Sequence, residues 1–333
     1  MTLSPAPLAE IWRGPIPESL HSGHAVICDA SGGILEAWGD PETVILPRSS
    51  AKMIQALPLI TSGAADRYGL SQAQLALACA SHQGANRHTD AVARWLSDLG
   101  LGETDLRCGA ETTRDRDLDI EMIRAGEAPC QLHNNCSGKH AGFLTLNRYM
   151  GGGAEYVAPD HPVQAAARDA FEEVTQMDSP GFGIDGCSAP NFATTMHGMA
   201  RAMAWFASAR ARSDRQSTAA ATLVEAMYAH PMLVAGEGRA CTRLMQAVTE
   251  PVALKTGAEG FFVAILPERG IGVAVKAADG ATRAAECAIA ALLVRLGAAE
   301  AAHPEVAAFL NPKITNRRGL DVGEIRAATG LLT

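Results

Sequence analysis

Residues 47–52 read Pro-Arg-Ser-Ser-Ala-Lys. It follows a short apolar run at 43–46 and opens a segment, 53–60, whose apolar residues recur at helical spacing. The pattern predicts a helix with Ser49 at or next to the N-cap and Lys52 one turn later on the same face. We therefore expect the Ser49 hydroxyl and the Lys52 amine to lie within reach of each other.

The spacing Ser-x-x-Lys is used by some acyl-transfer enzymes. The positive end of the helix dipole favours negative charge on the serine, and a neutral lysine one turn away can accept the hydroxyl proton. Serine and lysine also occur at this spacing by chance. The alternative interpretation, a capping serine followed by a solvated lysine, therefore stays open. A second pattern, Lys255-Thr256-Gly257, is typical of a strand in the same class of enzymes and favours the catalytic interpretation.

Composition and charge exclude several classes of protein. The 333 residues are enough to bury a large core, and 47% of them are hydrophobic, as in ordinary globular proteins. A formal net charge of -8 argues against a nucleic-acid partner. No apolar run is long enough to span a bilayer and the first residues lack a signal-peptide pattern, so we expect a cytoplasmic protein without a membrane partner. Its eight cysteines are scattered singly, which predicts no disulfide framework.

Strand patterns lie near the two ends of the chain. Residues 24–29 and 34–38 flank the turn sequence Ser31-Gly32-Gly33 and predict a hairpin, whereas 252–255, 261–266 and 271–277 predict a three-strand meander. The segment after about residue 300 shows no pattern that we can interpret. The middle of the chain is helical in pattern, with Ser71 and Asp160 as expected caps; the predicted helices cover 72–79, 87–99, 117–125, 160–175, 192–211, 216–229 and, after the meander, 281–296.

The two sets of strands most economically form one sheet, because either set alone would leave exposed edges. We therefore predict an α+β fold with an antiparallel sheet from N- and C-terminal strands, flanked by helices, and a mostly helical middle. The chain is expected to be a single domain, 1–333, that can divide into a sheet part (about 20–60 plus 250–300) and a helical part (about 61–249). Such a sheet brings Lys255 towards the Ser49 helix.

Two polar stretches carry an unusual choice of side chains. Residues 132–141 read Leu-His-Asn-Asn-Cys-Ser-Gly-Lys-His-Ala, and residues 183–190 read Gly-Ile-Asp-Gly-Cys-Ser-Ala-Pro. Helix starts and tight turns account for Asn, Ser, Gly and Asp without any function, so either stretch alone leaves the matter open. Local sequence likewise favours Ser81, in Ala-Ser-His-Gln-Gly at 80–84, as a turn serine.

Together with residues 48–52, 80–82, 237–239 and 255–257, these stretches resemble the class 3, rhizobial-type L-asparaginases. The matching segments spread from about residue 24 to about residue 297. The resemblance implies a fold like that of the serine β-lactamases and serine glutaminases. It also implies hydrolysis of L-asparagine to L-aspartate and ammonia, and a homodimer.

Carried over by motif, the resemblance implies Ser49 as the nucleophile with Lys52 as its partner, and Ser81 with Lys255 as a second pair in the same pocket. Which serine forms the covalent bond stays open. A lysine that acts as a base near neutral pH needs a pKa about three units below its usual value near 10.4, at a cost of roughly 4 kcal/mol. Burial and a second ammonium group both lower a lysine pKa, so two lysines in one site are consistent with each other.

The charged groups of the substrate need partners of opposite charge. Arg48 is a candidate to hold the α-carboxylate by a forked hydrogen bond, and Asp185 is a candidate to hold the α-ammonium group. The reaction is expected to pass through a seryl acyl-enzyme, with backbone N–H groups as the oxyanion hole.

The resemblance further implies a Zn²⁺ site formed by Cys136, Lys139 and Cys187. The residues alone favour His133 or His140 as the third ligand, because a protonated ammonium group cannot coordinate a metal. Three protein ligands leave a position for water or a substrate group, and acylation of the β-lactamase type does not need the metal. The alternative is two buried cysteines and a solvated lysine.

Two other functions stay open. The Ser/Lys groups could act on another acyl substrate, namely glutamine, a β-lactam or a peptide, although the absence of a signal peptide argues against substrates in the cell wall. The chain could instead be a zinc-stabilised binding protein, in which Ser49 and Lys52 only form a capped helix start.

Overall fold

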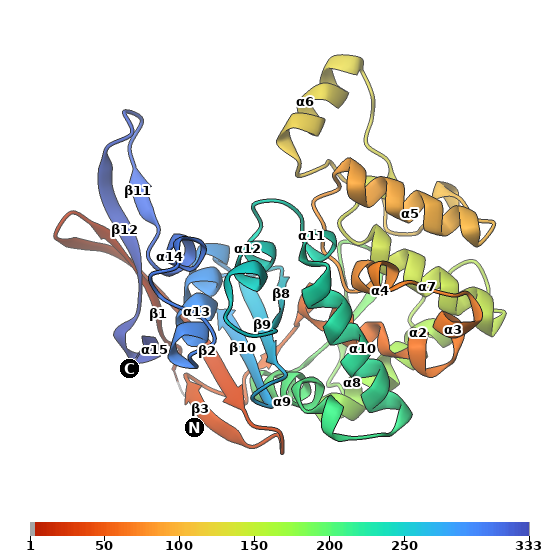
Figure 1. Ribbon diagram of the computed structural model, residues 1–333, viewed down its shortest axis with the longest axis horizontal. Coiled ribbons are helices and arrows are strands. Elements are labelled where there is room, and N and C mark those ends of the chain that lie inside the picture. Colours follow the sequence, from red (N-terminus) through yellow and green to blue (C-terminus); the bar gives the residue numbers. More distant parts are fainter. Residues whose placement is uncertain (1–3, 333) are drawn as a thin grey trace. The chain divides into compact units, whose positions relative to one another are not determined.

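The computed structural model describes residues 4–332, and these divide into two compact units (Figure 1). Unit 1 contains residues 4–50, 194–208 and 243–332, and unit 2 contains residues 51–193 and 209–242. Unit 1 holds the sheet and unit 2 is mostly helical. The predicted α+β fold is confirmed. Each unit is therefore described on its own.

Within the described residues, unit 1 is built on an eight-stranded antiparallel sheet with the order β11-β12-β1-β2-β10-β9-β8, and β3 pairs with β2. Strand β2 joins the N-terminal strands to the meander. It pairs with β10, and Val26 lies opposite Ala274. Strands from both ends of the chain thus share one sheet, as predicted. Its strands are β1 (Ala6–Arg13), β2 (Ile16–Cys28), β3 (Ile34–Trp38), β8 (Ala253–Gly257), β9 (Phe261–Leu266), β10 (Ile271–Ala277), β11 (Lys313–Thr315) and β12 (Asp321–Ala327).

Strands β1, β11 and β12 and the first half of β2 lie where no strand was predicted. These strands are only partly covered, so polar and apolar residues do not alternate over a useful length. In β12 only Ile325 and Ala327 are buried, and Ile16 and Leu20 of β2 are exposed although they are apolar. The last part of the chain, which showed no pattern, therefore completes the sheet through β11 and β12.

Strand β9 is buried along its whole length, which shows that the centre of the sheet is covered on both faces. The helices that contact it are α9 (Met196–Ala207) and α13 (Thr282–Arg295). Helix α9 lies very close to β10 at Gly272. A Cβ atom there would lie 2.0 Å from the Ala204 nitrogen and 2.4 Å from the Ala200 oxygen, so the backbones of helix and strand touch.

Unit 2 is organised around helix α7 (Ser137–Met150), which is buried from Ser137 to Asn147 and contacts α2, α3, α4, α5 and α8. Its other elements are α1 (Lys52–Gln55), α2 (Leu57–Thr61), α3 (Ala64–Arg67), α4 (Gln72–Ala78), α5 (Asn86–Asp98), α6 (Arg116–Ala125), α8 (Pro162–Thr175), α10 (Arg215–Ala229), α11 (Pro231–Val234), the hairpin β5 (Phe182–Ile184) with β6 (Pro190–Phe192), and the 3-10 turns η2 (Glu103–Asp105), η3 (Gln131–His133) and η4 (Ala209–Ala211). The predicted helical middle is confirmed, with bounds that differ by a few residues.

The remaining elements are short. Unit 1 also holds β4 (Val44–Ile45), paired with β7 (Thr194–Thr195), and helices α14 (Pro304–Leu310) and α15 (Thr329–Leu332), whereas α12 (Ala240–Ala247) begins in unit 2 and ends in unit 1. All eight cysteines lie in the described part of the chain and all are free, as predicted. No helix between residues 4 and 332 is long and apolar enough to cross a membrane.

Local predictions at two helix starts were wrong. Residues 53–60 form two short helices, α1 and α2, because Pro58 has no N–H to donate to the carbonyl of Ile54. Ser49 is not an N-cap: it lies in the 3-10 turn η1 (Arg48–Ala51) that precedes α1. The cap of α8 is His161, not Asp160, because its Nδ1 accepts from the N–H of Val163 at 3.2 Å.

The predicted cap of α4 is confirmed. The N–H of Gln74 donates to the Ser71 hydroxyl at 3.4 Å, and the Gln74 side chain accepts from the Ser71 N–H at 2.9 Å. This reciprocal pair is a capping box. The cap is formed by residues three positions apart, which is why a local pattern could indicate Ser71.

The close approach of α9 to β10 generates a stability prediction. We expect Gly272→Ala to lower the free energy of unfolding by about 2 kcal/mol or more, because the new methyl group meets helix backbone that cannot rotate away. Urea unfolding of the purified variant measures this change.

The matched control is Gly153→Ala, since a Cβ at Gly153 meets no atom within 4 Å. It should change stability by less than about 0.5 kcal/mol. A Gly272→Ala protein as stable as this control would contradict the tight packing of α9 on the sheet.

Candidate active site

The polar residues of unit 2 gather where helix α7 begins. The stretch Asn134-Asn135-Cys136 precedes this helix, and Gly138 lies in its first turn. A Cβ at Gly138 would lie 2.5 Å from the carbonyl oxygen of Leu77, so glycine allows α7 to approach α4. Because of this approach the first turn of α7, including Lys139, is buried.

Lys52 is the central group of this cluster, and it is only 1% exposed. Its Nζ donates to Ser81 Oγ at 2.9 Å, to Cys136 Sγ at 3.1 Å and to the carbonyl oxygen of Ala80. Three acceptors therefore surround the Lys52 nitrogen. Ser81 is therefore more than a turn serine: its hydroxyl is held at hydrogen-bonding distance from a buried lysine.

The contact between Lys52 and Ser81 differs from the pairs that the resemblance implied. Those pairs were Ser49 with Lys52, and Ser81 with Lys255. Ser49 lies three residues before Lys52 in the run formed by η1 and α1. A hydroxyl oxygen and an amine nitrogen 2.9 Å apart are close enough for proton transfer, which makes the Lys52 and Ser81 pair chemically competent in itself.

A second buried lysine lies beside two sulfur atoms. Lys139 Nζ is 3.0 Å from Cys187 Sγ, and the thiols of Cys187 and Cys136 are hydrogen-bonded to each other. This hydrogen bond, with the Lys139 ammonium group, holds the pKa of Cys187 far below its usual range. The same bond and burial raise the pKa of Cys136. Burial alone would lower the pKa of Lys139, but the charge at Cys187 offsets it and the net pKa is raised.

The side chains of Cys136, Lys139 and Cys187 are all buried and lie in contact with one another. The three side chains predicted to bind zinc lie together, and thiolate is the form of cysteine that binds a metal. The donor set therefore fits Zn²⁺, provided that the metal displaces the proton of Lys139. Within residues 4–332 no group of three His, Cys, Asp or Glu side chains could hold a metal ion, so a third ligand here has to be of another type.

The two histidines considered as ligands have other partners. The Nδ1 atom of His133 accepts from the N–H of Cys130 at 3.1 Å. The Nδ1 atom of His140 lies 2.9 Å from the Tyr156 hydroxyl, and burial lowers the pKa of His140 to about 4. His140 is therefore neutral near pH 7, and its Nδ1 is engaged by Tyr156.

The hairpin of β5 and β6 supplies Cys187 and Asp185 to the same region. Its turn is closed by the Asp185 N–H, which donates to the Ala189 carbonyl at 3.0 Å, and by a left-handed Ser188 with φ 68°. The turn buries Cys187 and leaves Asp185 partly exposed. Asp185 is close enough to help raise the pKa of Lys139, so its carboxylate is part of the electrostatic environment of the cluster.

Unit 1 carries the remaining predicted residues. The sequence Lys255-Thr256-Gly257 lies on strand β8, as predicted, and Lys255 is buried with its Nζ donating to the Thr256 carbonyl at 2.7 Å. The Ser50 hydroxyl donates to the Lys255 carbonyl at 3.1 Å. A Cβ at Gly257 would lie 2.6 Å from the carbonyl oxygen of Pro47, so β8 lies directly against the 47–50 segment. The expected approach of Lys255 to the Ser49 segment is confirmed.

Arg48 and Ser49 are half-buried residues of this 47–50 segment. Arg48 has a φ of 53°, in the left-handed region that few residues other than glycine adopt. Backbone of this kind costs roughly 1–2 kcal/mol and is frequent at functional sites.

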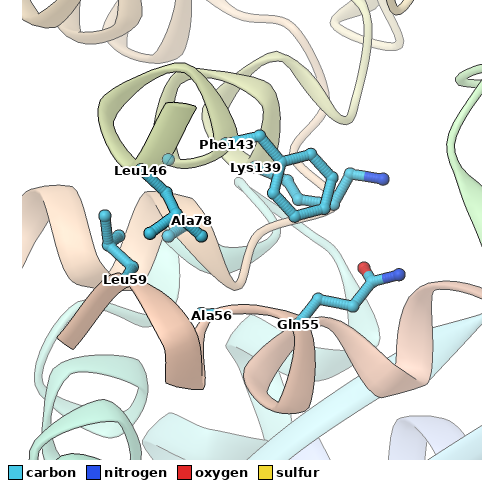
Figure 2. A pocket seen from close by; sticks show the side chains of 8 residues that line it. Gln55, Ala56, Leu59, Ala78, Lys139, Phe143 and Leu146 are labelled. Atoms are coloured by element: carbon cyan, nitrogen blue, oxygen red, sulfur yellow. The ribbon is translucent and has the colours of Figure 1, made fainter. Parts of the chain in front are cut away.

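Gln55 is a polar residue that the sequence analysis did not single out. It lies one turn after Lys52 and lines a pocket with apolar residues of α2, α4 and α7. Figure 2 shows the Gln55 amide and the Lys139 ammonium group at one end of this pocket, with Leu59 and Leu146 at the other. The sequence does offer one signal for Gln55. It lies three residues after Lys52, the same spacing as between Ser49 and Lys52.

The model of the family described as L-asparaginase II matches residues 9–327, which is nearly the whole chain. The protein belongs to the L-asparaginase II family. It is therefore an amidohydrolase, and the family supports hydrolysis of asparagine. The comparison with curated proteins found no match.

Solved structures similar to this L-asparaginase II family member share little sequence with it. A β-lactamase from Mycobacterium bovis is 14% identical, with 85% of this chain and 91% of that chain covered and a TM-score of 0.43. The native form of a protein named Mglu is 13% identical, with coverage of 79% and 61% and a TM-score of 0.41. An octameric penicillin-binding protein homologue from Pyrococcus abyssi is 11% identical, with coverage of 84% and 75% and a TM-score of 0.38. At these TM-scores the likeness carries no argument about function.

The burial of the cysteines generates a prediction about thiol reactivity. Burial raises the pKa of Cys28, Cys108 and Cys287 to about 12, whereas Cys130 is partly exposed. In native protein at pH 8 we expect iodoacetamide to alkylate Cys130 first, because the thiolate is the reactive form and needs access to solvent.

Peptide mass spectrometry of samples quenched over time measures the order of labelling. Protein unfolded in urea is the control, and in it all four thiols should react at similar rates. Labelling of Cys28 or Cys287 in native protein before Cys130 would contradict the burial described here.

Proposed function

We propose that this L-asparaginase II family member hydrolyses L-asparagine to L-aspartate and ammonia through a seryl acyl-enzyme. The observation that supports this most directly is the buried hydrogen bond from Lys52 Nζ to Ser81 Oγ. A buried lysine bonded to a serine hydroxyl is a costly arrangement that a binding protein does not need. When the lysine is neutral, the serine O–H can donate to its nitrogen instead, and this is the arrangement that activation of a hydroxyl nucleophile requires.

In the proposed reaction Ser49 is the nucleophile. Its oxygen attacks the side-chain carboxamide carbon of asparagine, and its proton passes to a neutral Lys52, one helical turn away. Collapse of the tetrahedral intermediate breaks the C–N bond, and the departing nitrogen takes the proton from Lys52 to leave as ammonia. Water then hydrolyses the aspartyl ester and returns the proton to the serine.

The other residues position these groups. Ser81 is bonded to Lys52 and can pass a proton to or from it, and Lys255 is proposed as the second lysine of the site. Arg48 would bind the substrate α-carboxylate and Asp185 the α-ammonium group. The orientation of asparagine would then be set by its charges, and the amide would be the group presented to the serine.

We further propose that Cys136, Lys139 and Cys187 bind Zn²⁺, on the strength of the buried donor set. A bound zinc ion would supply a Lewis acid with a free position for a polar group of the substrate or for water. The chain's own residues carry the acyl transfer. The class 3 subtype and a homodimer are part of the same proposal, supported by the resemblance of the sequence motifs.

Activity provides the first test. The purified protein should release ammonia from L-asparagine, and Ser49→Ala should lower kcat by about a thousandfold or more, because the nucleophile is gone. Ammonia release is measured with L-asparagine and, in parallel, with L-glutamine.

The control is Ser62→Ala, which also removes a partly buried hydroxyl and should stay within about twofold of the parent protein. Acid-quenched protein should carry an aspartyl ester on the peptide that contains Ser49, and an ester on the Ser81 peptide would reassign the nucleophile. Full activity in Ser49→Ala with no ester on either peptide would rule out the seryl mechanism.

Metal analysis provides the second test. Protein purified without chelator should contain about one zinc ion per chain, and Cys187→Ala should lose it because two ligands do not hold zinc. Elemental analysis by mass spectrometry measures the metal content.

Cys287→Ala is the matched control, since it removes another buried cysteine, on α13 in unit 1. It should keep the metal. Equal zinc content in both variants, or none in the parent protein after zinc is added, would refute the site.

A further inference from the structure

Gln55 is a buried polar residue to which the proposed reaction gives no role. Its side chain is 9% exposed, and its Nε2 donates to the carbonyl oxygen of Pro190 at 3.4 Å. A carbonyl oxygen can only accept, so the NH₂ side of the Gln55 amide faces Pro190 and the Oε1 atom faces away from it. This oxygen has no hydrogen-bond partner among residues 4–332, yet protein atoms do not seal it off. Water or a bound molecule therefore has to supply its donor.

The pocket that Gln55 lines is small and mostly apolar. Its walls are formed by the side chains of α2, α4 and α7, Leu59, Phe143 and Leu146 among them. The pocket has room for about one group of the size of water. Figure 2 shows the Gln55 amide on one side of this space, with the Phe143 ring and the Lys139 side chain on the other. Lys139 ends in a donor, so Gln55 is the lining side chain that offers an acceptor.

Gln55 lies on the same helix as the lysine of the proposed reaction. Gln55 and Lys52 are three residues apart in α1, so their side chains project from one face, with Cβ atoms about 5–6 Å apart. Lys52 Nζ in turn donates to Ser81 Oγ at 2.9 Å. A group bound beside Gln55 is therefore close to the lysine that exchanges protons in the reaction.

L-Asparagine has two groups that could donate to Gln55, the side-chain carboxamide and the α-ammonium group. The carboxamide ends an unbranched chain, and its NH₂ group is about as large as a water molecule. The α-ammonium group is attached to a carbon that also carries the carboxylate. That branch is too large for the space, and burying its charge between apolar walls would be costly. The carboxamide is therefore the group that fits the pocket.

We infer that Gln55 is a catalytic residue of the proposed reaction, whose Oε1 accepts a hydrogen bond from the amide nitrogen of the substrate. The inference rests on the proposed function. When the tetrahedral intermediate collapses, the C–N bond breaks, its electron pair goes to the nitrogen, and the nitrogen takes the proton from Lys52. The nitrogen gains positive charge in this step, so its bond to Oε1 is stronger in the transition state than in the bound substrate. Gln55 thereby assists the departure of ammonia.

Gln164 is a matched control within unit 2. It is fully buried, its Nε2 donates to the Tyr156 carbonyl at 2.8 Å, and its Oε1 also has no partner in the part of the chain that the structure describes. That oxygen, however, is sealed off by protein atoms. Methionine has nearly the length and volume of glutamine, so Gln55→Met and Gln164→Met each remove one bond to a backbone carbonyl. Only Gln55→Met also removes an acceptor from an open pocket.

The experiment compares L-asparagine with the β-methyl ester of L-aspartate, whose leaving group has no N–H. Both substrates form the same acyl-enzyme and release L-aspartate, which is the quantity measured, with hydrolysis in the absence of enzyme subtracted. Because kcat/KM reports the steps up to acylation, it is determined for both substrates in the parent protein and in each variant.

We expect Gln55→Met to lower kcat/KM for L-asparagine about 10- to 100-fold, since a bond to a group that becomes charged is lost. The value for the ester should change less than about threefold, because Oε1 has no N–H to accept from it. Gln164→Met should change the ratio of the two values by less than about twofold.

Two results would overturn the inference. A structural role affects acylation by either substrate, so equal losses with amide and ester in Gln55→Met would exclude the contact with the leaving nitrogen. An asparagine rate in Gln55→Met no lower than in Gln164→Met would exclude it as well, whatever the rate with the ester. Should Gln55→Met not fold, Gln55→Asn replaces it: its oxygen is withdrawn from the pocket by one methylene, and the ratio of amide to ester should fall in the same direction. An unchanged ratio would refute the role.

Two further variants separate this inference from the proposed function. Ser49→Ala and Lys52→Met are measured with both substrates in the same assay. If they keep full activity, the proposed function fails and the inference fails with it. If they abolish activity while Gln55→Met keeps the ratio of the parent protein, only the inference fails.

Discussion

The structure of unit 2 depends on how a buried lysine is satisfied. Lys52 has three acceptors, and they come from three different sources: a backbone carbonyl, the Ser81 hydroxyl and the Cys136 sulfur. Leaving such a group unpaired in the interior would cost several kcal/mol. The start of α7, the loop at 80–84 and helix α1 therefore have to meet at one point, and the small residue Gly138 allows α7 to approach closely enough.

Charge in this cluster is distributed without acidic residues at its centre. Lys139 is a buried cation, and the charge at Cys187 is the one that compensates it. Cys136 accepts a hydrogen bond from Lys52 and is hydrogen-bonded to Cys187. Sulfur thus performs the role that a carboxylate performs in most buried ion pairs, and the same sulfur atoms are suited to a soft metal ion.

Features that arise from neighbouring residues could be predicted from the sequence, and features that arise from distant ones could not. The meander around β9, the capping box at Ser71 and helix α6 follow from local patterns. Strands β1 and β12 were missed because their own residues are half exposed and show no strand pattern. Pairing with neighbouring strands, which are distant in sequence, makes them strands. At the site, Ser81 and the residues of the sulfur cluster were named only by the family resemblance. The bond between Lys52 and Ser81 joins residues 29 positions apart, and no local pattern predicts it.

The sheet of unit 1 has a consequence for synthesis of the protein on the ribosome. Strand β2 pairs with β10, so Cys28 cannot pair with Gly272 until about 240 more residues have been synthesised. At about 5–20 residues per second, the N-terminal hairpin exists for roughly 10–50 s before its partner emerges. During that time the edge of β2 that β10 will cover, with its apolar run Ala25-Val26-Ile27, is open to other chains. Newly made protein should therefore depend on chaperones that shield strand edges far more than the finished molecule does.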